Sequence, residues 1–299
     1  MKSPSRSSNE KIESEGDSYV RLVTLTHRGN SAAAVLGDGG TSPVGDGAFP
    51  DVGALLRAGE EGLEAAQEAL TKGGFSAYEP EALRRPVLNP GAIVCVGLNY
   101  KTHILEMGRE LPEYPTLFAK LPRALTDPFA EIVLPEASSR VDYEGELAVV
   151  IGKGGRDIPE DKAWEAVAGL TILNDVTMRD YQRRTIQWFA GKSWEASTPM
   201  GPAVVTPDEL DYPDGMELRV TVNGEERQRA PISDLVFDVP ALVSDLSKIF
   251  TLQPGDVIAT GTPGGVGEAM EPRHFLADGD IVEVTITGIG SIRNLFRGV

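Results

Sequence analysis

The stretch VDYEGELAVVIG, residues 141–152, joins a run of apolar residues typical of a buried strand to two glutamates, Glu144 and Glu146. Side chains alternate between the faces of a strand, so both carboxylates point to one face, roughly 7 Å apart along it. Such a pair repels itself unless a proton or a cation neutralises it. A third carboxylate, Asp175, ends the apolar run GLTILND, where it is costly unless it is bound. The pattern predicts either a solvated strand face or a cation site.

The residues around this stretch predict an α+β fold that is mostly β. From residue 91 onward, short apolar runs are separated by Gly and Pro, as in strands joined by turns. The sequence VNGE at 222–225 carries the Asn-Gly signal of a two-residue hairpin. The run VPALVSDLSKIFTLQPGD has helical periodicity and ends before Pro254. We expect this β-rich domain to span residues 89–299.

The chain before residue 89 differs in composition and in its hydrophobic pattern. Residues 1–17 are rich in Ser, Glu and Lys, and predict a disordered tail. Residues 18–88 predict a small α/β domain. In it YVRLVTLTHRG alternates like an edge strand, SAAAVLGDGG resembles its hairpin partner, and DVGALLRAGEEGLEAAQEALTKGG has the helical period.

Composition excludes several classes of function. The formal net charge of −17 and the absence of a basic run argue against binding to nucleic acid. No segment approaches the roughly 18 apolar residues that span a bilayer, and no signal peptide is recognisable at the N-terminus. The single cysteine, Cys95, cannot form an internal disulfide. We therefore expect a cytoplasmic protein that binds neither membrane nor nucleic acid.

The three carboxylates predict the kind of metal. Glu144, Glu146 and Asp175 have no cysteine and no histidine pattern nearby, and oxygen ligands alone indicate a hard cation. We expect Mg²⁺, with Mn²⁺ or Ca²⁺ as substitutes.

Several further side chains are candidates for the site. His103 and Glu106 are three residues apart, which suits either a catalytic dyad or a surface pair on one helical turn. Lys120 is interpreted as a snorkelling surface lysine or as a contact to a substrate carboxylate. Arg179 and Gln182 follow Asp175 and would share a helical face, either near the cation or as an ordinary polar surface.

Five motifs in order give a specific resemblance: GLNYKTHILEMG, DYEGELAVVIGK, ILNDVTMRDYQ, QWFAGKSWEASTPMGP and GDVIATGTPGGVG. Together they resemble the fumarylacetoacetate hydrolase superfamily, including bacterial acylpyruvases and 2-hydroxyhepta-2,4-diene-1,7-dioate isomerases. The resemblance implies a mixed β-sandwich roll, a homodimer, a His-Glu dyad on a lid and a divalent cation on the three carboxylates. It implies a catalytic Lys192 and substrate contacts from Tyr100, Lys120, Arg179, Gln182 and Thr262. Glu195 stands where many relatives carry Asp, which leaves its role open.

The resemblance implies a Mg²⁺-dependent enzyme acting on a small 2-oxo acid through an enolate. The hydrolysis of a carbon–carbon bond in a β-diketo acid of the acylpyruvate or fumarylpyruvate type is expected, in the catabolism of aromatic compounds, with His103 and Glu106 activating water. Isomerisation of 2-hydroxymuconate-type dienes and decarboxylation of an oxaloacetate-type acid are the alternatives. A non-catalytic metal-dependent binding protein is the alternative from another class.

Overall fold

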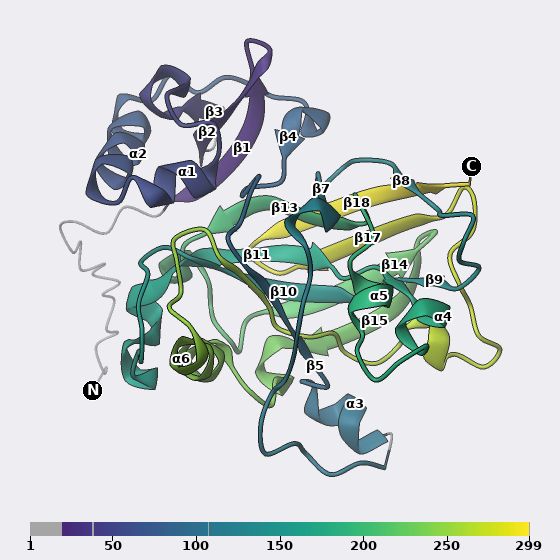
Figure 1. Ribbon diagram of the computed structural model, residues 1–299. Helices are drawn as coiled ribbons and strands as arrows, with labels where there is room; N and C mark the ends of the chain where they lie inside the picture. Colours follow the sequence, from purple (N-terminus) through teal and green to yellow (C-terminus); the bar gives the residue numbers. More distant parts are fainter. Residues whose placement is uncertain (1–19, 38, 107, 299) are drawn as a thin grey trace, which may run out of the picture.

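The computed structural model of the protein describes residues 20–37, 39–106 and 108–298 (Figure 1). The tail predicted over residues 1–17 lies outside this part of the chain. The structure confirms a mostly β fold, with two large sheets packed face to face and short helices around them. None of the helices in the described ranges is long and apolar enough to cross a membrane.

The larger sheet has 11 strands and includes β10 and β11, the strands next to the three carboxylates. Its main path is β3 (Gly40–Pro43), β2 (Asn30–Gly37), β1 (Arg21–His27), β13 (Thr198–Val205), β11 (Val167–Asn174), β10 (Gly145–Ile151), β16 (Val257–Ala259), β5 (Ile93–Gly97) and β6 (Thr116–Ala119). Two short strands join it from the side, β4 (Leu83–Arg84) on β1 and β7 (Leu125–Thr126) on β13. Most pairs are antiparallel, but β16 and β5 run parallel, so the sheet is mixed.

The second sheet has five strands and covers one face of the first. Its order is β15 (Glu225–Pro231), β14 (Glu217–Val222), β17 (Ile281–Ile286), β18 (Gly290–Arg297) and β8 (Ile132–Val133). The predicted hairpin joins β14 to β15, and Asn223 and Gly224 take the positive φ values, 53° and 81°, that a two-residue turn of this kind requires. A separate pair, β9 (Val141–Asp142) with β12 (Thr177–Met178), lies beside the site.

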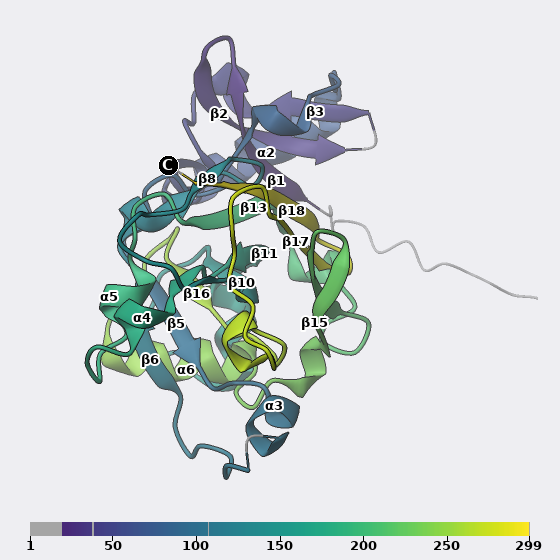
Figure 2. The same cartoon turned by 90° about the vertical axis from the view of Figure 1, so that its right-hand side faces the viewer.

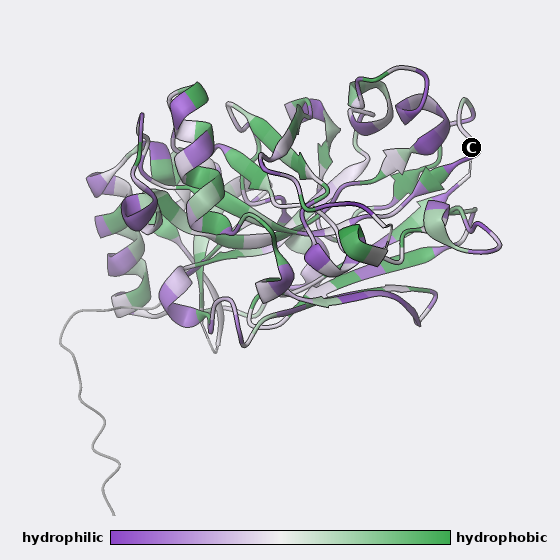
Figure 3. Ribbon diagram, turned by 90° about the horizontal axis from the view of Figure 1, so that it is seen from below, coloured by the Kyte–Doolittle hydropathy of each residue, from purple (hydrophilic) through white to green (hydrophobic). Residues whose placement is uncertain are grey.

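Strand β10 lies between two apolar layers. Leu147, Val149 and Ile151 pack toward the second sheet, whereas Ala148 and Val150 face the layer that contains the N-terminal helices. Each fully buried aliphatic side chain of this kind contributes about 1.5–3 kcal/mol. Figure 3 shows hydrophobic residues along the strands of the interior and mixed polarity on the surrounding helices.

The N-terminal residues are less separate than the sequence suggests. Strand β1 pairs with β2 on one side and with β13 on the other, through Arg21 opposite Val205 and Leu22 opposite Val204. The interpretation of β1 as an edge strand was therefore wrong, since it connects the N-terminal strands to the main sheet. Figures 1 and 2 place the helices of this region at one end of the molecule, opposite α3.

Most of the helices are short, and two of the α-helices begin at a side-chain cap. The single N-terminal helix expected from periodicity is two helices, because Gly59 with φ 61° separates them. Asp51 and Asp238 cap α1 and α6 by accepting backbone N–H groups. The α-helices are α1 (Val52–Arg57), α2 (Glu60–Lys72), α3 (Lys101–Glu106), α4 (Arg179–Gln182), α5 (Phe189–Lys192) and α6 (Val239–Ile249). The 3-10 helices are η1 (Val44–Gly47), η2 (Pro80–Ala82), η3 (Pro122–Ala124), η4 (Glu160–Ala166), η5 (Pro207–Glu209), η6 (Ile232–Asp234) and η7 (Gly267–Ala269).

Candidate active site

An acidic cluster forms where β10 begins and β11 ends. The antiparallel register sets Gly145 opposite Asn174, which brings the residues beside them together. The backbone N–H of Asp175 donates to the carbonyl of Glu144 at 2.8 Å, and fixes the two segments. One carboxylate oxygen from each of Glu144, Glu146 and Asp175 lies within 4.8 Å of the others, and all three residues are buried.

Three buried cations surround this cluster. Lys192 Nζ lies 2.5 Å from Glu144 Oε2 and 2.7 Å from Asp175 Oδ2. Lys120 Nζ lies 2.5 Å from Asp175 Oδ1, and its side chain is fully buried. Arg179 Nη1 lies 2.6 Å from Glu144 Oε1. Lys120 is therefore not a snorkelling surface lysine, because its ammonium is buried next to Asp175.

The charges change one another's pKa values. Burial raises the pKa of Glu146 well above its usual range, and the nearby carboxylates of Asp175 and Glu144 raise it further. Burial also acts against ionised Asp175, but Lys120 and Lys192 outweigh it and lower the pKa of that carboxyl. For Lys192 burial lowers the pKa, whereas Asp175 and Glu144 more than compensate and raise it. Lys192 is consequently a fixed positive charge at neutral pH.

The donor set of the cluster suits a hard divalent cation. It offers three carboxylate oxygens in a small buried space, and neither histidine nor cysteine is part of this group. Mg²⁺ and Mn²⁺ prefer such oxygen ligands and complete their coordination with water. Glu146 is also held in place, since its Oε2 accepts the backbone N–H of Gly261 at 2.9 Å. The residues present therefore fit a bound metal ion.

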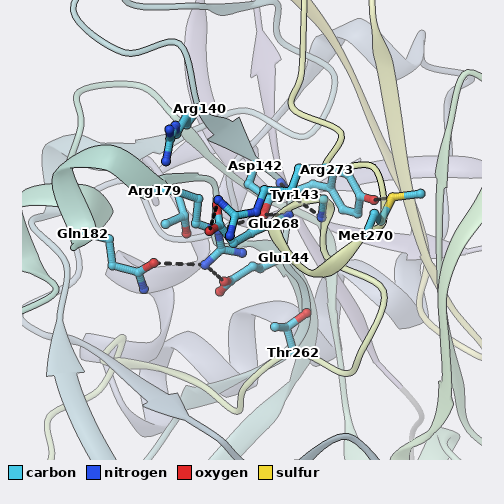
Figure 4. Close-up of polar contacts among 12 residues, drawn as sticks. Arg140, Asp142, Tyr143, Glu144, Arg179, Gln182, Thr262, Glu268, Met270 and Arg273 are labelled. Carbon is cyan, nitrogen blue, oxygen red and sulfur yellow. Dashed lines mark hydrogen bonds and ion pairs between the residues drawn. The ribbon is translucent and has the colours of Figure 1, made fainter. Parts of the chain in front are cut away.

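Arg179 and Gln182 lie together beside the cluster, which is one of the two arrangements that their spacing left open. Arg179 Nε donates to Asp142 Oδ2 at 2.8 Å, and Arg179 Nη1 donates to Gln182 Oε1 at 3.1 Å. Figure 4 shows the guanidinium between Asp142, Glu144 and Gln182. Its Nη2 is buried and has no hydrogen-bond partner within the described chain. Two of the five N–H donors of this arginine are thus engaged by carboxylates, a third by the amide oxygen of Gln182, and those on Nη2 by no atom of the described residues.

A cavity of about 280 Å³ opens over the acidic cluster. Polar side chains from five separate segments reach it, and apolar side chains form the rest of its wall. The lining includes Val96, Gly97, Leu98, His103, Phe118, Glu144, Glu146, Arg179, Gln182, Arg183, Trp188, Lys192, Thr262, Val266, Glu268 and Ala269. His103 on α3 thus faces the same space as Glu144, Glu146 and Lys192.

Two comparisons connect this arrangement to known proteins. Residues 92–297 match the family described as fumarylacetoacetate (FAA) hydrolase C-terminal. The chain belongs to this family. The oxaloacetate tautomerase YisK of Bacillus subtilis is 45% identical over 217 residues, which is 71% of this chain and 72% of that protein.

Solved structures of the fumarylacetoacetate hydrolase family share the fold. The fumarylacetoacetate hydrolase of Exiguobacterium antarcticum is 35% identical with a TM-score of 0.82, over 94% of this chain and 100% of that one. The maleylpyruvate hydrolase of Sphingobium, solved with manganese(II) and pyruvate, is 28% identical with a TM-score of 0.75, over 93% of this chain and 99% of that one. Family membership and an enzymatic fold are therefore established.

Not every residue that the family resemblance suggests lies on the cavity wall. Tyr100 is in the core, 1% exposed, and burial raises the pKa of its phenol. Lys120 reaches Asp175 but is not among the side chains that line the described cavity. Glu195 is exposed and is not among the residues that line the cavity. The backbone of Glu106 ends α3, but its side chain lies outside the described structure.

Sequence reasoning missed other residues of the site. Trp188 forms part of the cavity wall and packs edge-on against Phe118, with ring centroids 5.4 Å apart. A Cβ atom at Gly97 would lie 2.4 Å from the Trp188 ring, so glycine is required for this approach. Gln228 on β15 is buried, and its side-chain amide accepts a hydrogen bond from the N–H of Gly145 and donates one to the hydroxyl of Thr262. No local pattern marks Gln228, because its partners are far away in the sequence.

Proposed function

We propose that the protein catalyses the keto–enol interconversion of a small 2-oxo dicarboxylic acid of the oxaloacetate type. The observation that carries this proposal is the convergence of five polar side chains on one small cavity, beside the third carboxylate of the cluster, Asp175. They are His103, Glu144, Glu146, Arg179 and Lys192. The name of the Bacillus subtilis relative supports the same reaction. We further propose that Glu144, Glu146 and Asp175 hold Mg²⁺ or Mn²⁺, which the manganese in the Sphingobium structure supports.

The fixed charges of the chain would favour the enol form. A cation bound at the acidic cluster would withdraw electrons from a keto oxygen and make the neighbouring carbon more acidic. Lys192 supplies an ammonium group at the same wall, where it pairs with Glu144 and Asp175. The buried Nη2 of Arg179, which lacks a protein acceptor in the described residues, is suited to a substrate carboxylate. Negative charge that develops on the substrate would thus meet donors already in place.

His103 is our candidate for moving the proton. An imidazole accepts and returns protons near neutral pH, and general acid–base groups of this kind contribute about 10²–10⁴-fold. His103 lies on the cavity wall, so a proton on the substrate's C3 atom could pass to its ring. We propose that Glu106 orients the ring from the same helical turn. Gln182 and Thr262 would hydrogen-bond the substrate oxygens.

The experiment starts from the enol of oxaloacetate and follows its ultraviolet absorbance as it converts to the keto form. We expect the protein with Mg²⁺ to accelerate this decay, and chelation of the metal to remove the acceleration. His103→Gln should lower the rate by about 10²–10⁴-fold. His27→Gln, in the turn region at the end of β1, is the control and should not change it. A protein that never accelerates the decay would refute the proposal.

A second candidate is the hydrolysis of a carbon–carbon bond in an acylpyruvate or fumarylpyruvate-type acid. His103 on the wall beside the acidic cluster favours it, since a base there could activate water, and the Sphingobium relative is named a hydrolase. Acylpyruvates, fumarylpyruvate, oxaloacetate and a hydroxymuconate diene should be tested side by side, with the products identified by mass. Pyruvate together with a second carboxylic acid would indicate hydrolysis, pyruvate together with carbon dioxide would indicate decarboxylation of oxaloacetate, and a product of unchanged mass would indicate isomerisation. Cation binding without any turnover would identify a binding protein.

We also propose a homodimer. Ile186, in the segment between α4 and α5, is 93% exposed, and Phe189, the first residue of α5, is 48% exposed, on either side of the cavity residue Trp188 in the chain. Large apolar side chains exposed next to each other favour a covered surface. Light scattering should give twice the mass of the chain, and Ile186→Glu should shift the protein toward the monomer. A monomeric wild-type protein would refute this proposal.

A further inference from the structure

Gln228 occupies an unusual position between the two sheets. It belongs to β15 in the second sheet and is 1% exposed. Its side-chain oxygen accepts the backbone N–H of Gly145 at 3.0 Å, between the two glutamates of the acidic cluster. Its side-chain nitrogen donates to Thr262 Oγ1 at 2.8 Å and to the carbonyl of Pro263 at 2.8 Å, with Gly264 O at 3.4 Å.

These partners fix the orientation of the amide. The N–H of Gly145 requires an acceptor, so the amide oxygen must face β10. The carbonyl of Pro263 requires a donor, so the amide nitrogen must face the loop at 262–264. A flipped amide would leave the N–H of Gly145 and the carbonyl of Pro263 facing like groups, at a cost of about 1–3 kcal/mol for each buried group. The Nε2 atom therefore donates to the hydroxyl of Thr262.

We propose that Gln228 is a positioning residue that makes Thr262 a hydrogen-bond donor toward the ligand. The amide N–H occupies a lone pair of Thr262 Oγ1, and the hydroxyl proton donates to no protein atom within the described residues. Thr262 lines the cavity, so this proton is available there. Figure 4 shows Thr262 on the other side of Glu144 from Arg179. The ligand chemistry that fits is an anionic oxygen, a carboxylate or an enolate, which can only accept.

This inference rests on the proposed function because it takes Thr262 to face the substrate. The test avoids turnover by titrating oxalate, a dianion without hydrogen-bond donors, in a calorimeter at saturating Mg²⁺. Thr262→Val removes the hydroxyl with little change of shape and should weaken oxalate binding roughly tenfold or more. Thr262→Ser keeps the hydroxyl and should bind oxalate within about threefold of the wild type.

The decisive measurement is a double-mutant cycle. Gln228→Met should weaken oxalate binding when Thr262 is present and should have little further effect in the Thr262→Val background. Gln228→Glu provides a second route if the methionine variant does not fold. It keeps an acceptor for Gly145 but takes the hydroxyl proton of Thr262 itself, and it should weaken oxalate binding more in the wild-type background than in the Thr262→Val background.

A matched control separates positioning from simple loss of a buried amide. Asn294 on β18 is also 1% exposed and donates to the carbonyls of Asp127 and Ala130, away from the cavity. Asn294→Ala should lower the melting temperature while oxalate affinity stays unchanged. Equal losses from the Gln228 variants in both Thr262 backgrounds would overturn the proposal, as would failure of wild-type protein to bind oxalate. Strong coupling in a protein that converts no oxaloacetate would refute the proposed reaction alone.

Discussion

The two ends of strand β10 are equally buried and chemically opposite. At the charged end, residues 144–146, Glu144 pairs with Lys192 and Arg179, and Glu146 accepts the backbone N–H of Gly261. At the apolar end, residues 147–151, every side chain packs only in hydrophobic layers. The difference teaches that burial alone does not define a structural strand. The charged end is tolerated because its ionised groups have close partners, and removing one partner is costly.

The largest effect on activity is expected at the charged end. Glu146→Gln keeps the shape of the side chain but removes one proposed metal ligand, so metal-dependent activity should fall by at least about a hundredfold. The fold should persist without metal, because burial already disfavours the ionised carboxyl of Glu146. Enol decay and thermal unfolding are the measurements. Glu136→Gln, at an exposed loop position, is the control. Activity close to the wild-type level would show that the cation binds elsewhere.

The next effect concerns the cations that support the charged end. Lys120→Met deprives Asp175 of one of its two ammonium partners and should lower metal affinity by about 10–100-fold. The metal-free protein should also be destabilised, but by less than the roughly 3–5 kcal/mol of a fully unpaired buried charge, because Lys192 still pairs with Asp175. Metal titration and urea unfolding measure the two quantities. Lys153→Met, exposed just beyond the apolar end of β10, should change neither. An unaffected metal affinity would mean that Lys120 has no role in the site.

A third change lies at the boundary between the two ends. A Cβ atom at Gly145 would lie 2.4 Å from Val220 Cγ2, so Gly145→Ala should cost about 1–3 kcal/mol of stability. The displaced backbone would shift Glu144 and Glu146, and activity should fall several-fold as a result. Adding Val220→Ala removes the clashing methyl group and should restore part of both losses. If the double variant is no better than the single one, the clash with Val220 is not the cause.

The smallest effect on activity is expected at the apolar end. Leu147→Ala removes a fully buried side chain between the sheets and should lower the free energy of unfolding by about 2–5 kcal/mol. Below the unfolding transition, enol decay should remain within about threefold of the wild type, since no group of the cavity is changed. Urea unfolding and initial rates are measured on the same preparations. A folded but inactive variant would show that the two ends of β10 are not independent.

The local features of this molecule could be predicted from its sequence. Strand alternation placed Glu144 and Glu146 together, and the apolar run before Asp175 placed a third carboxylate at a strand end. The hairpin at Asn223 and the helix before Pro254 also follow from turn and capping chemistry. These features depend on residues that are neighbours in the chain, so periodicity and propensity are enough to find them.

What the sequence did not reveal depends on distant partners. Lys120 lies at the end of an apolar run like many surface lysines, and only the fold brings Asp175, 55 residues away, to its ammonium. Gln228 sits in the polar segment EERQRAP, and nothing there indicates that its amide meets Gly145 across the two sheets. The pairing of β1 with β13 joins residues far apart in the chain, which alternation within β1 cannot predict.

That pairing has a consequence for anyone who wishes to shorten this enzyme. A protein cut to begin at residue 89 would lack β1 and would leave part of β13 without a neighbour on that side. An open edge of this kind is a template for pairing with another copy, so such a minimal enzyme should aggregate rather than simply lose a module. Fusion partners are better placed at the turn between β1 and β2, which lies at the far end of this hairpin from the pairs with β13.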